Sequence, residues 1–344
     1  MTANDHAFEK LHPQWLTEYW FIACKSDQLK KRPLQRNILG NRMVLFRKTD
    51  GTPGAVKDQC IHRNLSLSRA KVCDAGLQCA YHGWTYDVDG SCVRIPAQTE
   101  PSGKQLRTRS WPVAESQGFV WVYMGKKSAN PQEIPRFPLV DDPRAVTWVM
   151  ERIFEGNALH CIENFLDIPH TIYVHSKWFR NESRKQIEFE VTGSSNHVCA
   201  EFFNEAQFDT FLGRLLIPRN AVMKHTDQYF KPYTTRVDYY FTDKRQFIVS
   251  SHCVPIDQHR TRVFTWMAFR FDPIAPLIRL IYEPLANRIL DQDVTVIREQ
   301  TEDIRAADRR AFLFHGTDVI GKEIFDLANG KRLAARIRKG KIAI

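Results

Sequence analysis

The chain has 344 residues, more than a typical single domain holds, so we expect two domains. Its 49 Lys and Arg residues outnumber its 39 Asp and Glu residues and give a net charge of +10, but no nucleic-acid-reading motif accompanies this surplus, so we expect no nucleic acid partner. No apolar run approaches the ~20 residues that cross a bilayer, and the polar N-terminus does not resemble a secretory signal, so we expect a cytoplasmic protein without a membrane partner.

Short apolar runs separated by turn residues make up the first part of the chain. Residues 19–23, 43–47 and 118–124 have the apolar and aromatic composition of buried strands. Residues 50–54 contain Gly and Pro and are expected to form a turn. The pattern predicts a small all-β domain.

Two mixed ligand pairs lie within this domain. Cys60 and His62 form a C-x-H pair, and Cys79 and His82 form a C-x-x-H pair. Two thiolates and two imidazoles suit a two-iron, two-sulfide cluster in which one iron takes both Cys and the other takes both His. They also suit a structural zinc ion, although zinc motifs usually keep like ligands together. These four residues alone leave zinc as an alternative.

The second pair continues as CAYHGWTYD over residues 79–87, with Gly90 beyond it. This run resembles the Rieske iron–sulfur proteins, whose second ligand pair lies in a C-x-Y-H-G-W-x-Y-[DN]-x-x-G segment. Arg63 and Leu67 also fit that family. The resemblance implies that a [2Fe–2S] Rieske cluster is bound by Cys60, His62, Cys79 and His82.

A proline-rich connection follows the Rieske-like segment. Four prolines lie between Pro131 and Pro143, a composition typical of irregular backbone. We therefore place the domain boundary here and expect domains at residues 1–135 and 136–344.

Asp167, His170 and His175 form a D-x-x-H-x-x-x-x-H pattern beyond this boundary. On an ideal helix His175 would point about 140° away from His170. The two imidazoles can converge only if the helix ends or bends, and Pro169 gives a physical reason for a break. Two imidazoles and a carboxylate would complete the 2-His-1-carboxylate site of a non-haem ferrous oxygenase. A His pair near a helix end can equally be structural.

The remaining chain alternates between strand and helix patterns. Residues 186–272 alternate apolar and polar side chains in several runs, which predicts a curved antiparallel sheet. Residues 280–300 have the apolar spacing of an amphipathic helix. The basic segment 321–344 could dock an acidic ferredoxin, but we expect it to be a solvated tail or helix.

These segments follow the Rieske motif in the order found in the Rieske non-haem iron oxygenases, whose large subunit the chain resembles. The resemblance implies that His170 and His175 are ligands of a mononuclear Fe²⁺. Residues 290–300 resemble the family's [EQ]-D-x-x-[VIL] segment, which implies Asp293 as the third ligand and leaves Asp291 as the alternative.

The same resemblance gives roles to residues before His170. Asp167 stands where the family has its bridging Asp, which links a cluster His of the neighbouring subunit to an iron-ligating His. A carboxylate that accepts from both imidazoles would fix their tautomers, while the alternative is a solvated charge on a helix face. Asn164 is expected near the iron, Glu163 is a weaker candidate, and His160 is expected to be a packed helix residue.

The expected fold class is α+β, with an N-terminal all-β Rieske domain followed by a helix-grip (START-like) catalytic domain. The expected function is the terminal oxygenase of a monooxygenase or dioxygenase system that hydroxylates or O- or N-demethylates a cyclic or aromatic small molecule. No FAD, NAD or P-loop motif is present, so electrons are expected from a ferredoxin or ferredoxin reductase. The bridge between subunits implies a homotrimer. The alternatives are a Rieske electron-transfer protein with a non-catalytic second domain and a zinc-stabilised interaction protein.

Overall fold

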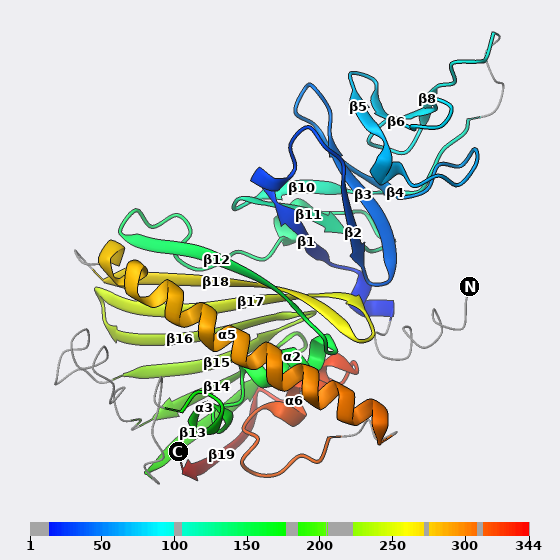
Figure 1. Ribbon diagram of the computed structural model, residues 1–344. Coiled ribbons are helices and arrows are strands. Elements are labelled where there is room, and N and C mark those ends of the chain that lie inside the picture. The colour runs from blue at the N-terminus through cyan, green and yellow to red at the C-terminus, as the bar shows by residue number, and fades with distance from the viewer. Residues whose placement is uncertain are drawn as a thin grey trace. The chain divides into compact units, whose positions relative to one another are not determined.

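A computed structural model describes residues 14–99, 105–176, 185–203, 205, 223–271, 275–307 and 312–343 (Figure 1). By its internal contacts the chain divides into two compact units, Met1–Arg136 and Phe137–Ile344. Within the described ranges, no helix combines the length and the apolar character needed to span a membrane.

The described part of the first unit is built on three small antiparallel sheets. Their strands are, sheet by sheet, β1 (Trp20–Lys25), β11 (Phe119–Tyr123) and β10 (Val113–Ser116); β2 (Leu34–Ile38), β3 (Asn41–Arg47), β4 (Pro53–Lys57) and β9 (Ser110–Trp111); and β5 (Lys71–Cys73), β6 (Gly76–Gln78), β7 (Thr85–Tyr86) and β8 (Cys92–Arg94). Short 3-10 helices lie between them: η1 (Gln14–Thr17), η2 (Ser26–Gln28), η3 (Leu67–Arg69) and η4 (Pro131–Glu133). The predicted all-β character of this region is confirmed.

A buried apolar cluster joins the second and third sheets of this unit and carries both metal-ligand loops. Val44, Phe46 and Val56 from β3 and β4 pack with Leu77 and Tyr86 from β6 and β7, and all five side chains are buried. Cys60 and Cys79 belong to the same cluster. The core therefore fixes the position of both thiols because they are part of it.

The second unit contains an eight-stranded antiparallel sheet in the order β12-β18-β17-β16-β15-β14-β13-β19. Its strands are β12 (Ala145–Phe154), β13 (Gln186–Gly193), β14 (His197–Phe203), β15 (Lys224–Phe230), β16 (Thr234–Thr242), β17 (Arg245–Asp257), β18 (Arg260–Phe271) and β19 (Arg336–Ala343). The antiparallel sheet predicted from the alternation over residues 186–272 is confirmed. Residues 204, 206–222 and 272, which that prediction also covers, lie outside the described residues.

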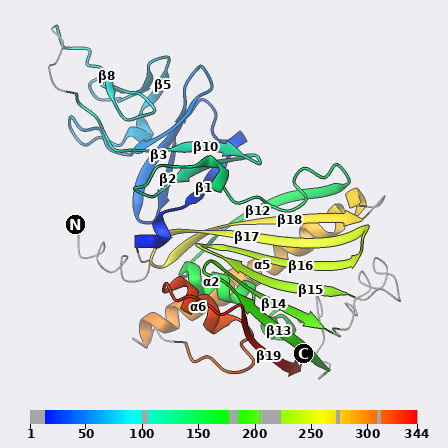
Figure 2. The same ribbon diagram turned by 180° about the vertical axis from the view of Figure 1, so that it is seen from behind.

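The long helix α5 (Ala275–Ala306) lies across one face of this sheet, as the two opposite views show (Figures 1 and 2). Its buried residues Ala286, Leu290, Asp293, Ile297 and Thr301 recur every three or four positions, so they share one face of the helix. A Cβ at Gly156 would collide with Ile297, so a glycine allows the close approach of backbone and helix there. The amphipathic helix predicted over residues 280–300 is confirmed and is longer at both ends.

Three shorter helices complete the described part of the unit: α2 (Ala158–Phe165), α3 (His170–Tyr173) and α6 (Gly321–Ala328). Asn157 caps α2 by accepting a hydrogen bond from the Leu159 amide at 2.9 Å. The helix ends at Phe165, and Pro169 lies at the N-cap of α3. The helix therefore ends just before the two histidines, at the place where Pro169 predicted a break.

Of the solvated tail or helix expected at the C-terminus, the structure has a helix in α6, but that helix buries Ile324 and Leu327. Beyond it the chain forms β19, which pairs with β13 at the sheet edge and buries Ile342 opposite Ile187. Basic residues of this strand face acids on β13, with Lys339 Nζ 3.0 Å from Glu190 and Lys341 Nζ 2.8 Å from Glu188. Cross-strand pairing covers an edge that local sequence patterns do not reveal.

Candidate metal centres and cavity

The two ligand loops of the first unit have the same backbone hydrogen bonds. The Cys60 amide donates to the Leu65 carbonyl at 2.8 Å, and the Cys79 amide donates to the Trp84 carbonyl at 2.8 Å. The fourth residue after each Cys, Asn64 or Gly83, donates back to the Cys carbonyl and has a positive φ. Asn and Gly are the residues that tolerate this conformation, so the sequence allows two similar tight loops to face one another.

These loops bury the sulfurs and leave the imidazoles near the surface. Cys60 and Cys79 are 2% and 3% exposed, whereas His82 is exposed and His62 is half-buried. The two imidazole rings are 4.6 Å apart between centroids, and His62 stacks on Trp84 at the same distance. Desolvation, followed by the charges of His82 and Arg63, lowers the pKa of His62, which favours the neutral imidazole that metals bind.

The spacing of the four donors favours a cluster over a single zinc ion. All four residues are described, yet no three of them bring their donor atoms within 4.8 Å of one another. The ligands of one tetrahedral zinc lie about 4 Å or less apart. A [2Fe–2S] cluster separates its two thiolates from its two imidazoles, so these residues fit that group.

The hydroxyl of Tyr86, a residue that sequence reasoning did not single out, contacts one of the two buried sulfurs. Tyr86 Oη lies 3.1 Å from Cys60 Sγ, and the Ile61 amide donates to the same oxygen at 3.3 Å. Tyr86 is fully buried, and burial, together with Cys60, raises its pKa far above the usual range, so it stays a protonated donor. The sequence signal was its place in the CAYHGWTYD run.

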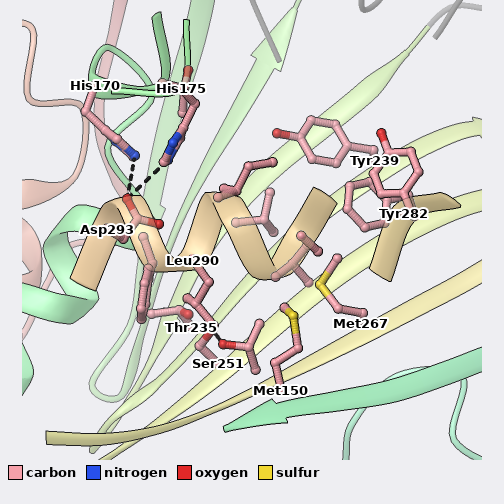
Figure 3. Close-up of a pocket in the computed structure, with 18 residues that line it drawn as sticks. Met150, His170, His175, Thr235, Tyr239, Ser251, Met267, Tyr282, Leu290 and Asp293 are labelled. Atoms are coloured by element: carbon pink, nitrogen blue, oxygen red, sulfur yellow. Dashed lines mark hydrogen bonds and ion pairs between the residues drawn. The ribbon is translucent and has the colours of Figure 1, made fainter. Parts of the chain in front are cut away.

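In the second unit the structure brings His170, His175 and Asp293 together, from α3, the turn after it and α5. Asp293 Oδ1 lies 3.1 Å from His175 Nε2 and 3.7 Å from His170 Nε2, and the three donor atoms all lie within 4.8 Å of one another (Figure 3). Asp293 is 5% exposed, and its Oδ1 accepts no hydrogen bond from the described residues. A buried carboxylate oxygen without a donor, facing two imidazole nitrogens, fits a divalent metal ion.

Hydrogen bonds at the far side of each ring orient the two imidazoles. His175 Nδ1 lies 2.9 Å from Gln292 Oε1, and His170 Nδ1 contacts the Asp167 carbonyl. Both oxygens are acceptors, so each Nδ1 carries the proton and each Nε2 presents its lone pair. Sequence reasoning missed Gln292, because a glutamine on a helix is usually solvated and only its facing partner distinguishes it.

Asp167 lies beside His170, with a carboxylate that remains partly open. Its Oδ2 accepts from the His170 backbone amide at 3.1 Å and lies 3.5 Å from His170 Nδ1, and the side chain is 23% exposed. Burial opposes protonation of His170, but Asp167 and Asp293 outweigh it and raise the pKa of the imidazole. The two carboxylates thus make a negative environment that a cation would neutralise.

The other predicted residues have different surroundings. Asp291 is bound by Arg152 at 2.7 Å, with a side chain that is 58% exposed. Asn164 is buried and its Nδ2 has no partner among the described residues, but it does not line the cavity next to the histidines. His160 packs against Phe312 with centroids 4.4 Å apart, as expected for a helix residue. Burial, followed by the charges of Asp167 and Asp318, raises the pKa of Glu163 to about 7.

A cavity of about 140 Å³ lies between α5 and the sheet and opens onto His170, His175 and Asp293. A cavity of ~150 Å³ is large enough for benzene, so this one has room for a molecule of about one ring. Nine of the 18 described lining side chains are apolar, and six of the nine polar ones carry a hydroxyl. The described lining residues are Met150, Phe165, His170, Thr171, His175, Thr235, Val237, Tyr239, Phe247, Val249, Ser251, Thr265, Met267, Tyr282, Ala286, Ile289, Leu290 and Asp293.

Comparison with known families gives two matches that together include both candidate centres. Residues 19–113 match the Rieske [2Fe-2S] domain, and residues 154–320 match the vanillate O-demethylase oxygenase C-terminal domain. The oxygenase component of dicamba O-demethylase from Stenotrophomonas maltophilia is 32% identical over 53% of this chain and 54% of that protein. The 3-chlorobenzoate-3,4-dioxygenase oxygenase subunit from Comamonas testosteroni is 35% identical over 46% of this chain and 38% of its own length. The chain thus spans about half, or less, of the length of these relatives.

Solved structures share the fold over nearly the whole chain. Dicamba monooxygenase bound to 3,6-dichlorosalicylic acid aligns with a TM-score of 0.80 at 22% identity, covering 91% of this chain and 98% of that one. Pseudomonas putida CBB5 NdmA with caffeine aligns with a TM-score of 0.76 at 19% identity, covering 95% and 92%. With both domain types present in one chain, the protein belongs to the Rieske non-haem iron oxygenases, and its first domain is of the type that carries a [2Fe-2S] cluster.

Proposed function

We propose that the chain is the terminal oxygenase component of a Rieske-type system. It uses O₂ and electrons from a ferredoxin or ferredoxin reductase to hydroxylate, or to O- or N-demethylate, a cyclic or aromatic small molecule. The observation that carries this proposal is the position of His170, His175 and Asp293 at one end of a largely apolar cavity of single-ring size. The names of the similar proteins include an O-demethylase and a dioxygenase, which supports both reaction types.

The residues divide into two groups with different tasks. Cys60, His62, Cys79 and His82, in a domain at residues 1–135, would hold the cluster. His170, His175 and Asp293, in a domain at residues 136–344, would hold the iron. When bound, the cluster supplies electrons and the iron supplies the activation of dioxygen. Gln292 holds one imidazole in the required tautomer, and the apolar walls exclude water from the substrate.

Asp167 is proposed as the bridge to a neighbouring subunit. Its carboxylate touches His170 on one side and is partly open on the other, so a second imidazole could donate to it. This role requires another copy of the chain, and we propose a homotrimer for that reason. Asn164 is proposed as an accessory residue near the iron.

Electron donors and location follow from the same proposal. A separate ferredoxin or reductase would deliver electrons at the exposed His82 side of the cluster. No disulfide joins any of the eight cysteines, all of which are described, and a reducing cytoplasm keeps cysteines in this state, so we propose a cytoplasmic location.

The test is turnover by the purified full chain with NADH and a Rieske-type reductase. Methoxy- and N-methyl-substituted aromatics serve as substrates, with formaldehyde release and incorporation of labelled oxygen as readouts. We expect O₂-dependent product from at least one of these substrates. A protein that shows the Rieske paramagnetic signal after reduction, yet holds only cluster iron and forms no product, would instead be an electron carrier.

A further inference from the structure

Three hydroxyl side chains form a row across neighbouring strands at the floor of the cavity. Thr235 on β16 lies directly opposite Ser251 on β17, and Ser251 lies directly opposite Thr265 on β18. All three line the cavity and are 2% to 3% exposed. We call these three residues the hydroxyl row.

The hydroxyl row has more hydrogen-bonding capacity than it uses. Ser251 Oγ and Thr265 Oγ1 lie 3.1 Å apart and share one hydrogen bond, which occupies one of their two O–H groups. The Thr235 hydroxyl lines the cavity next to this pair. One O–H of the pair and the hydroxyl of Thr235 can therefore donate to an acceptor in the cavity.

The next two rows of the sheet become progressively less polar. Two residues along, Val237, Val249 and Met267 are paired across the same strands, and two further along Tyr239 is opposite Phe247. Figure 3 shows Thr235 and Ser251 near the part of α5 that carries Leu290 and Asp293, with Tyr239 and Tyr282 at the opposite end. The cavity is thus polar beside the proposed iron site and aromatic at its far end.

The far end is built for a flat apolar group. Tyr239 and Phe247 stack with centroids 5.7 Å apart, and Tyr282 meets Phe247 edge-on at 5.8 Å. Such aromatic walls favour a ring or an alkyl body through burial and stacking. A ligand in the cavity would place its apolar part here and its polar atom at the hydroxyl row.

We propose that the hydroxyl row binds an uncharged hydrogen-bond acceptor, a carbonyl or ether oxygen, on a substrate of about one ring. That this ligand is a substrate rests on the proposed function. The assignment narrows that function to neutral substrates rather than carboxylates. Hydroxyl donors satisfy a neutral oxygen, but a buried carboxylate needs a cation, and none of the described lining residues is Lys or Arg. The row lies toward the end of the cavity that holds the iron site, so an oxygen bound there directs the carbon attached to it toward that end (Figure 3).

The experiment measures binding of small probes to the full chain by ligand-observed NMR, without an electron donor. Acetophenone and ethylbenzene have nearly the same shape but differ in the carbonyl oxygen, and benzoate replaces it by a carboxylate. We expect acetophenone to bind roughly three- to tenfold more tightly than ethylbenzene, the range that one or two hydrogen bonds give. Benzoate should bind more weakly than acetophenone.

Variants assign that preference to the hydroxyl row. Thr235→Val, and Ser251→Ala combined with Thr265→Val, should bring the acetophenone-to-ethylbenzene ratio toward one. Ethylbenzene affinity should stay unchanged, which also shows that the cavity is intact. Thr301→Val is the matched control, because Thr301 is a buried threonine on α5 whose hydroxyl has no partner among the described residues and does not line the cavity.

Several outcomes would overturn the assignment. These are equal or undetectable binding of acetophenone and ethylbenzene to the unmodified chain, tighter binding of benzoate, or a ratio unaffected by the row variants. A ratio that falls as far in Thr301→Val would have the same consequence. Because no turnover is involved, an inactive protein with the expected ratios would refute the proposed oxygenase function alone.

Discussion

Gln292 and Asp293, consecutive residues of α5, contact opposite nitrogens of the same imidazole. Gln292 Oε1 lies 2.9 Å from Nδ1 of His175, while Asp293 Oδ1 lies 3.1 Å from Nε2. The amide oxygen can only accept, so Nδ1 is the protonated nitrogen and Nε2 is free to bind a metal. One turn of one helix therefore supplies both a proposed ligand and the group that orients a second ligand.

Removing the Gln292 amide is expected to weaken iron binding without affecting the cluster. In Gln292→Leu the imidazole of His175 loses its acceptor, and outer hydrogen bonds of this kind contribute roughly 10- to 100-fold to metal affinity. The measurement is competitive chelation of the mononuclear iron, with the visible spectrum of the cluster as an internal reference. Gln300→Leu, a change of the same type further along α5, should leave iron affinity unchanged. Equal retention of iron in both variants would remove Gln292 from this role.

Asp293→Ala is expected to release the mononuclear iron and leave the cluster. The variant should contain about one iron less per chain, because two imidazoles alone hold Fe²⁺ weakly. Asp291→Ala is the control, since the Asp291 side chain is 58% exposed and paired with Arg152. Iron analysis, together with the Rieske signal after reduction, distinguishes the two centres. A loss of iron in Asp291→Ala, with none in Asp293→Ala, would reverse the ligand assignment.

Local patterns in the sequence predicted the features that depend on a few neighbouring residues. The short spacings around Cys60 and Cys79 indicated two ligand pairs, and Pro169 indicated the helix break ahead of His170. The resemblance of residues 290–300 to the family's segment implied Asp293 as a ligand, and this residue lies on the buried face of α5. Each of these inferences needs only one segment and its own geometry.

Features that depend on pairing between distant segments could not be predicted in this way. The hydroxyl row requires the register of β16, β17 and β18, and a shift of one residue would turn Thr235 to the other face of the sheet. The edge strand β19 pairs residues more than a hundred positions apart in the chain, such as Ile187 and Ile342. Nothing in either segment alone specifies its partner.

Loss of the Tyr86 hydroxyl is expected to lower the reduction potential of the cluster. An O–H group directed at the Cys60 sulfur, 3.1 Å away, stabilises the additional negative charge of the reduced state. In Tyr86→Phe a redox titration followed by circular dichroism should therefore show a more negative midpoint. Tyr123→Phe removes a hydroxyl that bonds Glu18 at 3.1 Å in the same unit, and its midpoint should stay at the wild-type value. An unchanged midpoint in Tyr86→Phe would mean that this hydroxyl does not act on the cluster.

A buried ion-pair cluster around His225 makes the stability of the second unit depend on pH. His225 is 1% exposed, with Nδ1 2.7 Å from Glu205 and Nε2 3.0 Å from Asp227, and its ring stacks on Phe202 and Tyr239. Burial disfavours the charged imidazole, but the two carboxylates outweigh it and raise the pKa of His225 from 6.5 to about 9. Such a rise corresponds to about 3 kcal/mol of stability.

Because the pKa is higher in the folded state, this stability is fully present below about pH 6.5 and is lost as the pH rises through about 9. The free energy of unfolding of the unmodified chain should exceed that of His225→Gln most near neutral pH, and the difference should shrink by up to about 3 kcal/mol toward pH 10. Urea unfolding from about pH 7 to about pH 10 measures it, provided the transition of the second unit is resolved. The control is His252→Gln. Burial lowers the pKa of His252 to about 3, so this imidazole is neutral throughout the range. The difference in the free energy of unfolding between this variant and the unmodified chain should therefore not vary with pH. Parallel pH curves for the two variants would mean that His225 is not charged in the folded protein.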